Sequence, residues 1–452
     1  MRATLLPIAL SCFTAFSFII PARAGVRMPA ILGHNMVLQS GQKLPIWGWA
    51  EKGETVTVAV AGQSASAIAD EHGRWKVTLK PIDSTEQALE MKVTAPSGSI
   101  TITNILVGEV WVTGGQSNMG MVVHAAQDAA KEGAAARWPK LRLFTVYEQH
   151  GDQPLENCKG WWFESNPHDT TWYSAITYYF GRMMHQELQR PVGMICTAVG
   201  GTPIQGWTRR ATLERLNING TGDLYNGMVA PLSSLSIRGV LWYQGEGNVT
   251  EPARFGAVFP EMIRDWRHTF GQEQMPFLFV QIAPCRYPEP NANLMGIWDA
   301  QLKTFKRTPN TGMVVTTDLV NDLNNVHPLN KQDVAYRLGL WALAKVYGRT
   351  VDCSGPVYQT MSVTGNKIQL TLDYSQGLKA ADGQPLRDFT IAGADQKFVP
   401  ARAEIKRQKI VVFSDQVARP VAVRFGWHMD ATPNLVNRAN LPASPFRTDN
   451  WE

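Results

Sequence analysis

Short runs in which apolar and polar residues alternate fill the chain from residue 26 to residue 105. A period of two places the apolar side chains on one face of a β-strand, and turns separate the runs. Several short strands at this spacing predict a small β-sandwich-like module at residues 25–105. The expected strands are Met36–Leu38, Leu44–Trp49, Thr55–Val60, Trp75–Leu79 and Ile100–Ile102.

From about residue 106 the hydrophobic runs become nearly continuous and alternate with helix-like stretches. Strands that are apolar on both faces and joined through helices are typical of a parallel sheet covered on both sides. The pattern therefore predicts an α/β fold with a doubly wound parallel sheet at residues 106–350. The expected strands are Val110–Thr113, Val192–Val199, Val240–Tyr243, Phe277–Ile282 and Met313–Thr317, and the expected helices lie near 172–188, 257–269, 296–307 and 331–347.

The end of the chain returns to short alternating runs, such as Lys367–Leu372 and Lys409–Phe413. These runs predict a second small β module at residues 351–452. The α/β domain is therefore expected to be flanked by a β module on each side.

The first 24 residues have the pattern of a targeting segment. Arg2 precedes an apolar stretch from Leu5 to Ile20, and Ala22-Arg23-Ala24 is a small-x-small cleavage pattern. We predict a secretory signal peptide at residues 1–24 and export to the periplasm or the extracellular space. The apolar run continues past Cys12, which favours simple export over attachment of a lipid there. No later run of about 18 apolar residues occurs, so no membrane span is predicted.

Composition and charge narrow the classes of function. The 452 residues are 44% hydrophobic and 18% charged, with a formal net charge of +5, as in an ordinary globular protein. No long run of like charges occurs, so we predict no nucleic-acid partner. The cysteines after residue 24 are far apart and lack metal-ligand spacing, so we predict no metal site and leave disulfide pairing and oligomeric state open. They are Cys158, Cys196, Cys285 and Cys353.

Ser117 lies where the first strand of the predicted sheet ends and a helix should begin. The segment reads V-W-V-T-G-G-Q-S-N-M-G from Val110 to Gly120. A serine at such a corner has an exposed hydroxyl beside free backbone N–H groups, which suits a nucleophile. The alternative is that Ser117 only caps the helix. Met119 replaces the second glycine of G-x-S-x-G, which disfavours the nucleophile elbow of the α/β-hydrolases.

Other strand ends carry residues that fit the same chemistry, because ligands of an open parallel sheet bind beyond the carboxyl ends of its strands. Gly200 and Gly201 can bring backbone N–H groups close to an oxyanion, although they also fit an ordinary turn. The Gln244 amide needs a partner at a buried strand end, either an oxyanion or a neighbouring loop. His327, in the loop after the last strand, is the candidate base. Together these residues predict an acyl-transfer site with Ser117 as nucleophile.

Motifs along the chain resemble a known family. Gly115–Met119, Gly200–Ile204, Tyr225–Met228, Trp242–Glu246, His327-Pro328 and Lys331-Gln332 follow one another in the order seen in the sialate O-acetylesterases of the SGNH-hydrolase superfamily, as do Asn35–Gln39 and Trp47-Gly48. The resemblance covers nearly the whole chain after residue 24. It implies a flavodoxin-like catalytic domain and cofactor-free hydrolysis of acetyl esters on sugars. It also implies that Ser117 is the nucleophile, His327 the base and Gln244 an oxyanion donor.

The third member of a triad is left open by a departure from the family pattern. The superfamily's acid usually lies three residues before the histidine, where this chain has Asn324. Asp322 is our first choice for the acid and Asp318 the second, and a backbone carbonyl orienting His327 is a third option. Asn325 could also cap the following helix.

Substrate contacts are predicted from the residues beside these motifs. We assign Gln116, Asn118, Glu246 and Trp207 to substrate binding, with Trp207 and Trp242 as candidates for stacking on a sugar, although tryptophan at strand ends is also typical of a core. A sialic acid carboxylate would need a cation, for which Arg209, Arg210 and Arg286 are candidates unless they are only solvated.

The predicted function is a secreted serine esterase that removes O-acetyl groups from carbohydrates, foremost from sialic acids. Acetylated plant polysaccharides such as xylan or xyloglucan are the alternative substrates. A non-catalytic glycan-binding protein is the alternative from another class, although the presence of both Ser117 and His327 argues against it. Hydrolysis of lipid esters or thioesters is a third reading, which would require a long apolar channel.

Overall fold

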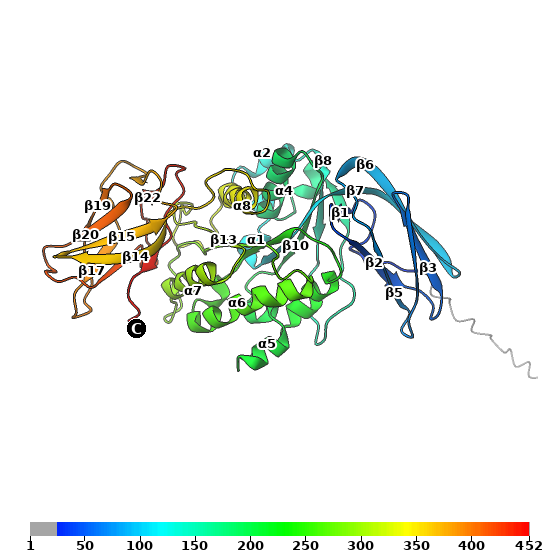
Figure 1. Ribbon diagram of the computed structural model, residues 1–452, viewed down its shortest axis with the longest axis horizontal. Helices are drawn as coiled ribbons and strands as arrows, with labels where there is room; N and C mark the ends of the chain where they lie inside the picture. Colours follow the sequence, from blue (N-terminus) through cyan, green and yellow to red (C-terminus); the bar gives the residue numbers. More distant parts are fainter. Residues whose placement is uncertain (1–24, 452) are drawn as a thin grey trace, which may run out of the picture.

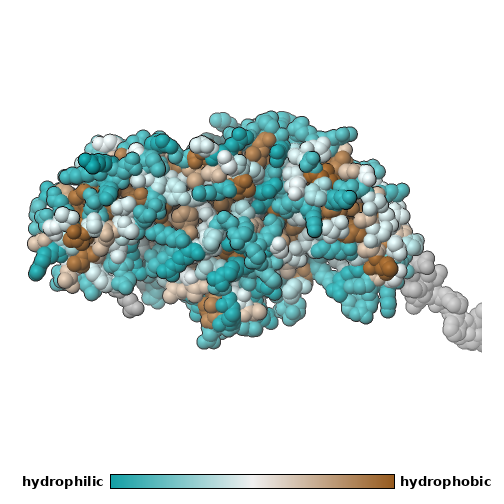
Figure 2. Space-filling model, in the orientation of Figure 1, coloured by the Kyte–Doolittle hydropathy of each residue, from teal (hydrophilic) through white to brown (hydrophobic). Residues whose placement is uncertain are grey.

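The computed structural model describes residues 25–451, and its three parts lie in a row along the long axis of the molecule (Figure 1). The N-terminal β module is at one end, the α/β domain in the middle and the C-terminal β module at the other end. The predicted signal peptide, residues 1–24, lies outside the described residues. The face drawn in Figure 2 is mostly hydrophilic, with small scattered hydrophobic spots.

The N-terminal module consists of two layers of strands. Three antiparallel strands, β3, β4 and β6, extend from the first half of β7, which also pairs with β1. Strands β2 and β5 pair separately. The sequence prediction missed β4 and β6, because the β4 segment Q-S-A-S-A-I has small and polar residues on both faces. The bounds are β1 Val37–Gln39, β2 Leu44–Trp49, β3 Thr55–Val60, β4 Gln63–Ile68, β5 Arg74–Leu79, β6 Thr85–Ala95 and β7 Gly98–Gly115.

Strand β7 is 18 residues long and belongs to both the N-terminal module and the α/β domain. Its first half pairs with β6 and β1, and its second half, from Glu109 to Gly115, pairs with β10 and β11. The domain boundary expected between residues 105 and 106 falls inside this strand. The two parts of the chain are therefore joined by a continuous element and not by a linker.

The central sheet has the order β13-β12-β11-β7-β10-β8-β9. All neighbouring strands are parallel except β9, which pairs antiparallel to β8 at the edge. The α/β fold class and the five expected strands are confirmed, whereas β8 and β9 were not predicted. The bounds are β8 Trp138–Thr145, β9 Trp162–Ser165, β10 Val192–Ala198, β11 Gly239–Tyr243, β12 Phe277–Val280 and β13 Thr311–Val314.

Helices cover both faces of this sheet, with α4 and α8 on one side and α6 and α7 on the other (Figure 1). These four helices match the predicted ones. Trp266 of α6 packs edge to face on Trp242 of β11, with ring centroids 5.6 Å apart, so the sheet and helix share an aromatic core. The bounds are α1 Ser117–Gly120, α2 Ala129–Ala134, α3 Pro167–Thr170, α4 Ala175–Leu188, α5 Arg210–Arg215, α6 Pro252–Thr269, α7 Leu294–Arg307 and α8 Gln332–Lys345, with short turns η1 Val123–Ala125, η2 Ile204–Trp207, η3 Tyr225–Val229, η4 Ala230–Leu232 and η5 Glu246–Asn248.

The C-terminal module contains small antiparallel sheets, in the orders β14-β15-β20-β19, β18-β17-β21-β23 and β16-β22. Arg447 joins it to the α/β domain through an ion pair with Asp299 of α7 at 3.2 Å. The bounds are β14 Val357–Thr364, β15 Lys367–Asp373, β16 Lys379–Ala380, β17 Phe389–Ala392, β18 Val399–Pro400, β19 Arg402–Lys406, β20 Lys409–Phe413, β21 Ala422–Phe425, β22 Leu435–Val436 and β23 Phe446–Arg447.

The cysteine residues of the described chain are buried and unpaired. They pack as small hydrophobic side chains, and burial raises the pKa of the Cys158 thiol to about 12. Among residues 25–451, no helix is both long and apolar enough to cross a bilayer.

Candidate active site

Ser117 and His327 meet at the carboxyl edge of the central sheet. The Ser117 Oγ lies 2.7 Å from the His327 Nε2, although 210 positions separate the two residues in the chain. Ser117 begins α1 directly after β7, and His327 lies in the loop between β13 and α8. The sequence predicted that these two groups converge, and this distance is short enough for direct proton transfer between them.

The strand order places this pair at a topological switch point. After β7 the chain forms β8, β9 and β10 on one side of β7 and then β11, β12 and β13 on the other side, so the loops after β7 and its two neighbours diverge. A crevice opens where such loops separate, and ligands of doubly wound sheets bind there. The residues that follow β7, β10 and β11 are therefore the ones able to contact a ligand at Ser117.

Glycines allow close approach of the backbone around Ser117. Gly115 has a φ of +136°, and a Cβ there would lie 2.1 Å from the carbonyl oxygen of Tyr243, so only glycine fits this corner. A Cβ on Gly200 would lie 3.6 Å from the Ser117 Cβ, which places the glycine loop next to Ser117. Within residues 25–451 the backbone N–H groups of Ser117, Gly200 and Gly201 donate to no acceptor. They are available to an oxyanion.

Gln244 does not have the free amide expected of an oxyanion donor. Its side chain is fully buried, and its Nε2 donates to the carbonyl oxygen of Thr202 at 3.2 Å and to Asn248 Oδ1 at 2.8 Å. Both amide hydrogens are thus used inside the protein. Asn248 Oδ1 also accepts from the backbone N–H of Ile204 at 2.9 Å. This correction assigns Gln244 to holding the loop after β10 against the end of β11, which is the alternative that the sequence left open.

The residues assigned to substrate binding are buried and bonded to other protein groups. Trp207 has no exposed surface, and its indole N–H donates to Thr202 Oγ1 at 2.9 Å, while Trp242 is likewise fully buried. Gln116 Oε1 accepts from the backbone N–H of Gly247 at 3.0 Å. These side chains offer no surface to a sugar, so their assignment to sugar contacts does not fit the structure. At a strand end, a polar or aromatic residue that faces a neighbouring loop has the same sequence pattern as one that faces a ligand.

Asn118 is the centre of a buried polar network beneath the Ser117–His327 pair. Its Nδ2 donates to Glu246 Oε1 at 2.6 Å and to the carbonyl oxygen of Val326 at 2.9 Å. Its Oδ1 accepts from Lys331 Nζ at 2.7 Å. Asn118 and Glu246 therefore contact each other and not a substrate, contrary to the sequence prediction. Their network links the residue after Ser117 to the residue before His327.

Charges in this network shift the pKa values of the site. Burial lowers the pKa of Lys331 to about 8 and raises the pKa of the Glu246 carboxyl. Burial, followed by the Lys331 ammonium, lowers the pKa of His327 from its usual value. His327 is therefore neutral at pH 7, the form that accepts a proton from a serine hydroxyl. The sequence prediction assigned no role to Lys331, because the sequence does not show whether a lysine at the start of a helix is buried.

Neither candidate aspartate contacts the His327 ring. Asp322 accepts a hydrogen bond from the backbone N–H of Asn324 at 2.9 Å, and Asp318 forms an ion pair with Arg337 at 2.5 Å. No hydrogen bond reaches His327 Nδ1 from any residue between 25 and 451. Asn325 caps no helix, and its Oδ1 accepts from the backbone N–H of His327 at 2.9 Å. The structure thus brings Ser117 and His327 together without a contact from either candidate aspartate.

The three candidate arginines lie in different surroundings. The backbone N–H of Arg286 donates to the carbonyl oxygen of Leu323 at 2.8 Å, which places Arg286 beside the His327 loop, and its guanidinium pairs with Asp430 at 3.1 Å. Arg210 is exposed and bonds to the carbonyl oxygen of Thr221. Arg209 lines a pocket near the N-terminal module. Only Arg286 is thus tied to the loop that carries the base.

An exposed tryptophan beside the site was missed by the sequence analysis. Trp172 is 63% exposed, and its ring lies 4.9 Å from that of His124. The segment that carries His124 follows α1 and also contacts the carbonyl oxygen of Leu329 through the backbone N–H of Gln127 at 2.9 Å. Trp172 therefore packs against a segment that lies between α1 and the loop before α8. Its neighbours along the chain have no motif that would have distinguished it.

Comparisons with known proteins agree with this arrangement. A family model described as carbohydrate esterase, sialic acid-specific acetylesterase matches residues 107–346. The chain is 28% identical to the sialate O-acetylesterase of Homo sapiens over 94% of this chain and 93% of that protein. It is also 28% identical to the sialate O-acetylesterase of Mus musculus over 90% of each. The structure is similar to the crystal structure of a carbohydrate acetylesterase from Xanthomonas citri, with a TM-score of 0.89 and 35% identity over 94% of this chain and 100% of that one.

The fold and these likenesses define the class as a carboxylic ester hydrolase. More particularly, the chain belongs to the carbohydrate esterase family of sialic acid-specific acetylesterases. The family resemblance predicted from the sequence motifs is confirmed.

Proposed function

We propose that this protein removes O-acetyl groups from sialic acids by a serine mechanism in which Ser117 and His327 act as a dyad. The observation that carries the proposal is the distance of 2.7 Å between Ser117 Oγ and His327 Nε2. The names of the relatives support acetylated sialic acid as the substrate class. Acetylated plant polysaccharide is the alternative substrate.

The reaction proceeds in two steps. Ser117 Oγ attacks the acetyl carbonyl carbon while its proton passes to His327 Nε2, and the tetrahedral oxyanion accepts hydrogen bonds from the backbone N–H groups of Ser117 and Gly200. The C–O bond to the sugar then breaks, and His327 returns the proton to the sugar oxygen. Water, deprotonated by His327, attacks the acetyl-enzyme, and acetate leaves as Ser117 regains its proton. Asp322 remains a candidate for orienting His327, and the free Nδ1 supports a dyad without it.

The test is the release of acetate from 9-O-acetyl sialic acid and from acetylated xylan and xyloglucan, offered side by side. We expect the sialic acid ester to be turned over fastest. Ser117→Ala and His327→Ala should each lower kcat by about a thousandfold or more, because each removes one half of the proton transfer. Circular dichroism should show that both variants remain folded. A wild-type protein without esterase activity would favour the glycan-binding alternative, and preference for a plant polysaccharide would overturn the substrate assignment.

Export also belongs to this proposal. The apolar stretch after Arg2 and the cleavage pattern Ala22-Arg23-Ala24 support a signal peptide. Mass spectrometry of the protein secreted by its host should find an N-terminus at Gly25. A mature chain that begins at Met1 would contradict export by this route.

A further inference from the structure

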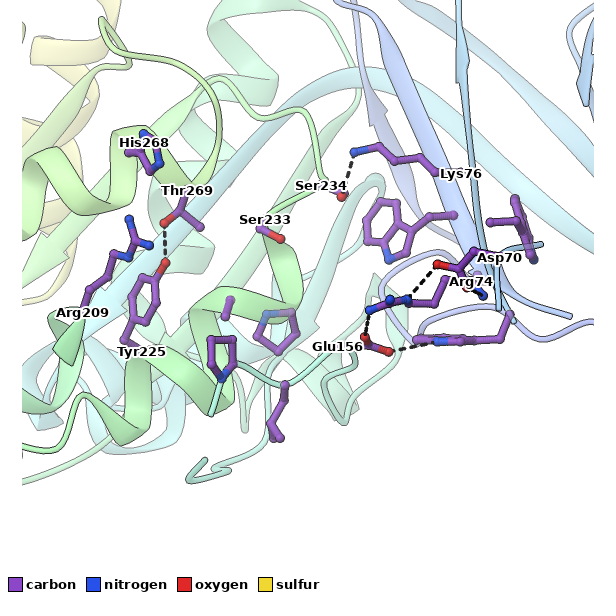
Figure 3. Close-up of a pocket in the computed structure, with 18 residues that line it drawn as sticks. Asp70, Arg74, Lys76, Glu156, Arg209, Tyr225, Ser233, Ser234, His268 and Thr269 are labelled. Atoms are coloured by element: carbon purple, nitrogen blue, oxygen red, sulfur yellow. Dashed lines mark hydrogen bonds and ion pairs between the residues drawn. The ribbon is translucent and has the colours of Figure 1, made fainter. Parts of the chain in front are cut away.

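A pocket of about 650 Å³ lies between the N-terminal module and the α/β domain (Figure 3), and Ser117 is not among its lining residues. Its wall on the α/β side includes Ser233 and Ser234, which precede β11, and His268 and Thr269 at the end of α6. Residues before the start of a parallel strand lie at the amino edge of the sheet, whereas Ser117 follows the carboxyl end of β7. The pocket and the esterase site are therefore at opposite edges of the same sheet.

The N-terminal module supplies an aromatic and cationic wall to this pocket. In the antiparallel pair β2–β5, Trp47 lies opposite Lys76 and Trp49 lies opposite Arg74. Residues directly opposite each other point to the same face, and side chains two positions apart share that face, so these four side chains form one surface. Both tryptophans are half-buried, which leaves part of each ring accessible. Such rings pack well against the C–H face of a pyranose.

The charges of the pocket are not balanced. Arg74 is neutralised by Asp70 at 3.2 Å and by Glu156 at 3.0 Å. Lys76 Nζ contacts the uncharged Ser234 Oγ at 3.0 Å. The Arg209 guanidinium forms no ion pair with any residue from 25 to 451, although the Asp265 carboxylate accepts a hydrogen bond from the Arg209 backbone N–H at 3.1 Å. Figure 3 shows Lys76 and Arg209 on opposite sides of the two serines. Two cationic head groups that form no ion pair with the described residues favour a ligand that carries a carboxylate.

We propose that this pocket binds an acidic sugar chain, with a pyranose ring against Trp47 and a sugar carboxylate on Lys76 or Arg209. The inference rests on the proposed function, since it assigns a second contact to the glycans on which the esterase acts. Because the two sites lie at opposite edges of the sheet, the pocket would hold one branch of a multivalent glycan while another branch is deacetylated. Such a second contact raises the effective concentration of ester at Ser117.

Direct binding tests the ligand class. The full-length Ser117→Ala protein is titrated calorimetrically with sialyllactose and with lactose, and the titration is repeated with Lys76→Ala and Arg209→Ala added. We expect sialyllactose to bind. The Lys76→Ala and Arg209→Ala substitutions together should raise its Kd by roughly tenfold, which corresponds to the loss of one charge-assisted hydrogen bond. Lys92→Ala, which removes an exposed lysine of the same module outside the pocket, should leave the Kd unchanged. The proposal would be overturned if lactose bound as tightly as sialyllactose, or if the Kd for sialyllactose stayed unchanged in the protein with both pocket substitutions.

Kinetics separate this inference from the proposed function. In the protein with an intact Ser117, the Lys76→Ala/Arg209→Ala variant should hydrolyse 4-nitrophenyl acetate at the wild-type rate. Its KM for an O-acetylated sialoglycoprotein should rise severalfold, with kcat unchanged. Trp47→Ala should also raise the KM for the O-acetylated sialoglycoprotein. An unchanged KM in these variants would overturn the second site while leaving the esterase intact, whereas a wild-type protein inactive on both esters would overturn the proposed function itself.

Discussion

Asn118 Nδ2 donates a hydrogen bond of 2.9 Å to the carbonyl oxygen of Val326, so the residue after the nucleophile is bonded to the residue before the base. The same side chain also binds Glu246 and Lys331. One buried amide thus connects the loops after β7, β11 and β13. We expect the distance between Ser117 and His327 to depend on this connection.

Replacing Asn118 by alanine should lower kcat more than it changes KM. The variant frees the Val326 loop, leaves Glu246 Oε1 without its donor and leaves Lys331 Nζ with only the carbonyl oxygen of Pro328. We therefore expect kcat to fall by about ten- to a hundredfold and the free energy of unfolding to fall by about 1–3 kcal/mol. Asn330→Ala is the matched control, since Asn330 Oδ1 accepts a hydrogen bond of 3.0 Å from the backbone N–H of Asp333 in the first turn of α8. It should lower the Tm but leave kcat intact, and an equal loss of kcat in both variants would contradict the positioning role of Asn118.

The acid limb of the pH profile should have its midpoint below pH 6.5, because burial and Lys331 lower the pKa of His327. The neutral imidazole is the active form, so activity persists as the pH falls to 6.5 and is lost only when the pH passes through the lower pKa. Lys331→Met removes the nearby positive charge and should move the limb of kcat/KM to higher pH. A limb that stays in place would mean that Lys331 does not act electrostatically on His327.

Gly200→Ala should impair catalysis without unfolding the protein. The added methyl group would be in ordinary contact with Ser117 Cβ, at 3.6 Å, and would meet no other atom within 4 Å. It would nevertheless occupy space beside the nucleophile that the acetyl group needs, so we expect kcat/KM to fall about tenfold or more with an unchanged Tm. Gly201 has a φ of +70°, so Gly201→Ala should instead lower the Tm. A fully active Gly200→Ala enzyme would place the acetyl group elsewhere.

Alanine at Asp322 distinguishes a dyad from a triad. A triad carboxylate that orients the histidine is worth about four orders of magnitude in kcat. Because Asp322 bonds to Asn324 and not to the His327 ring, we expect Asp322→Ala to retain kcat within about tenfold. A loss as large as that of His327→Ala would establish Asp322 as the acid. Asp318→Ala should mainly lower the Tm, since it leaves the buried Arg337 guanidinium without its carboxylate partner.

Trp172→Ala should weaken glycan binding and spare the chemistry. An exposed indole beside the site can pack against a sugar ring, and its loss removes apolar contact area worth about 1–2 kcal/mol. We expect KM for 9-O-acetyl sialic acid to rise by about fivefold to thirtyfold, while hydrolysis of 4-nitrophenyl acetate is unchanged. Trp161→Ala, which removes another tryptophan exposed by 63%, is the control and should change neither value.

The sheet and the Ser117–His327 pair could be predicted because both follow from local patterns and one topological rule. Apolar strands and amphipathic helices alternate from residue 106, and the carboxyl ends of parallel strands meet at one edge. Residues just after Gly115 and just before α8 must then lie at the same edge of the sheet, although β13 is three strands away from β7. No knowledge of side-chain packing is needed for that step.

The roles of Gln244, Asn118 and Glu246 could not be predicted in the same way. A polar side chain at a strand end must be satisfied, but the sequence does not state whether its partner is a ligand or another loop. Here the partners are Thr202, Val326 and other protein groups that are far away in the chain. Burial of the Lys331 ammonium depends on the same distant contacts.

The continuity of strand β7 limits how this enzyme can be truncated. A deletion that ends at residue 105 would cut through a continuous strand and remove the β1 and β6 partners of residues 106–108, which lead directly into the half that pairs with β10 and β11. The N-terminal module should therefore melt together with the esterase domain in one cooperative transition, and it cannot be exchanged like a tethered accessory. Chimeras of this architecture need to inherit the module and the nucleophile from the same parent.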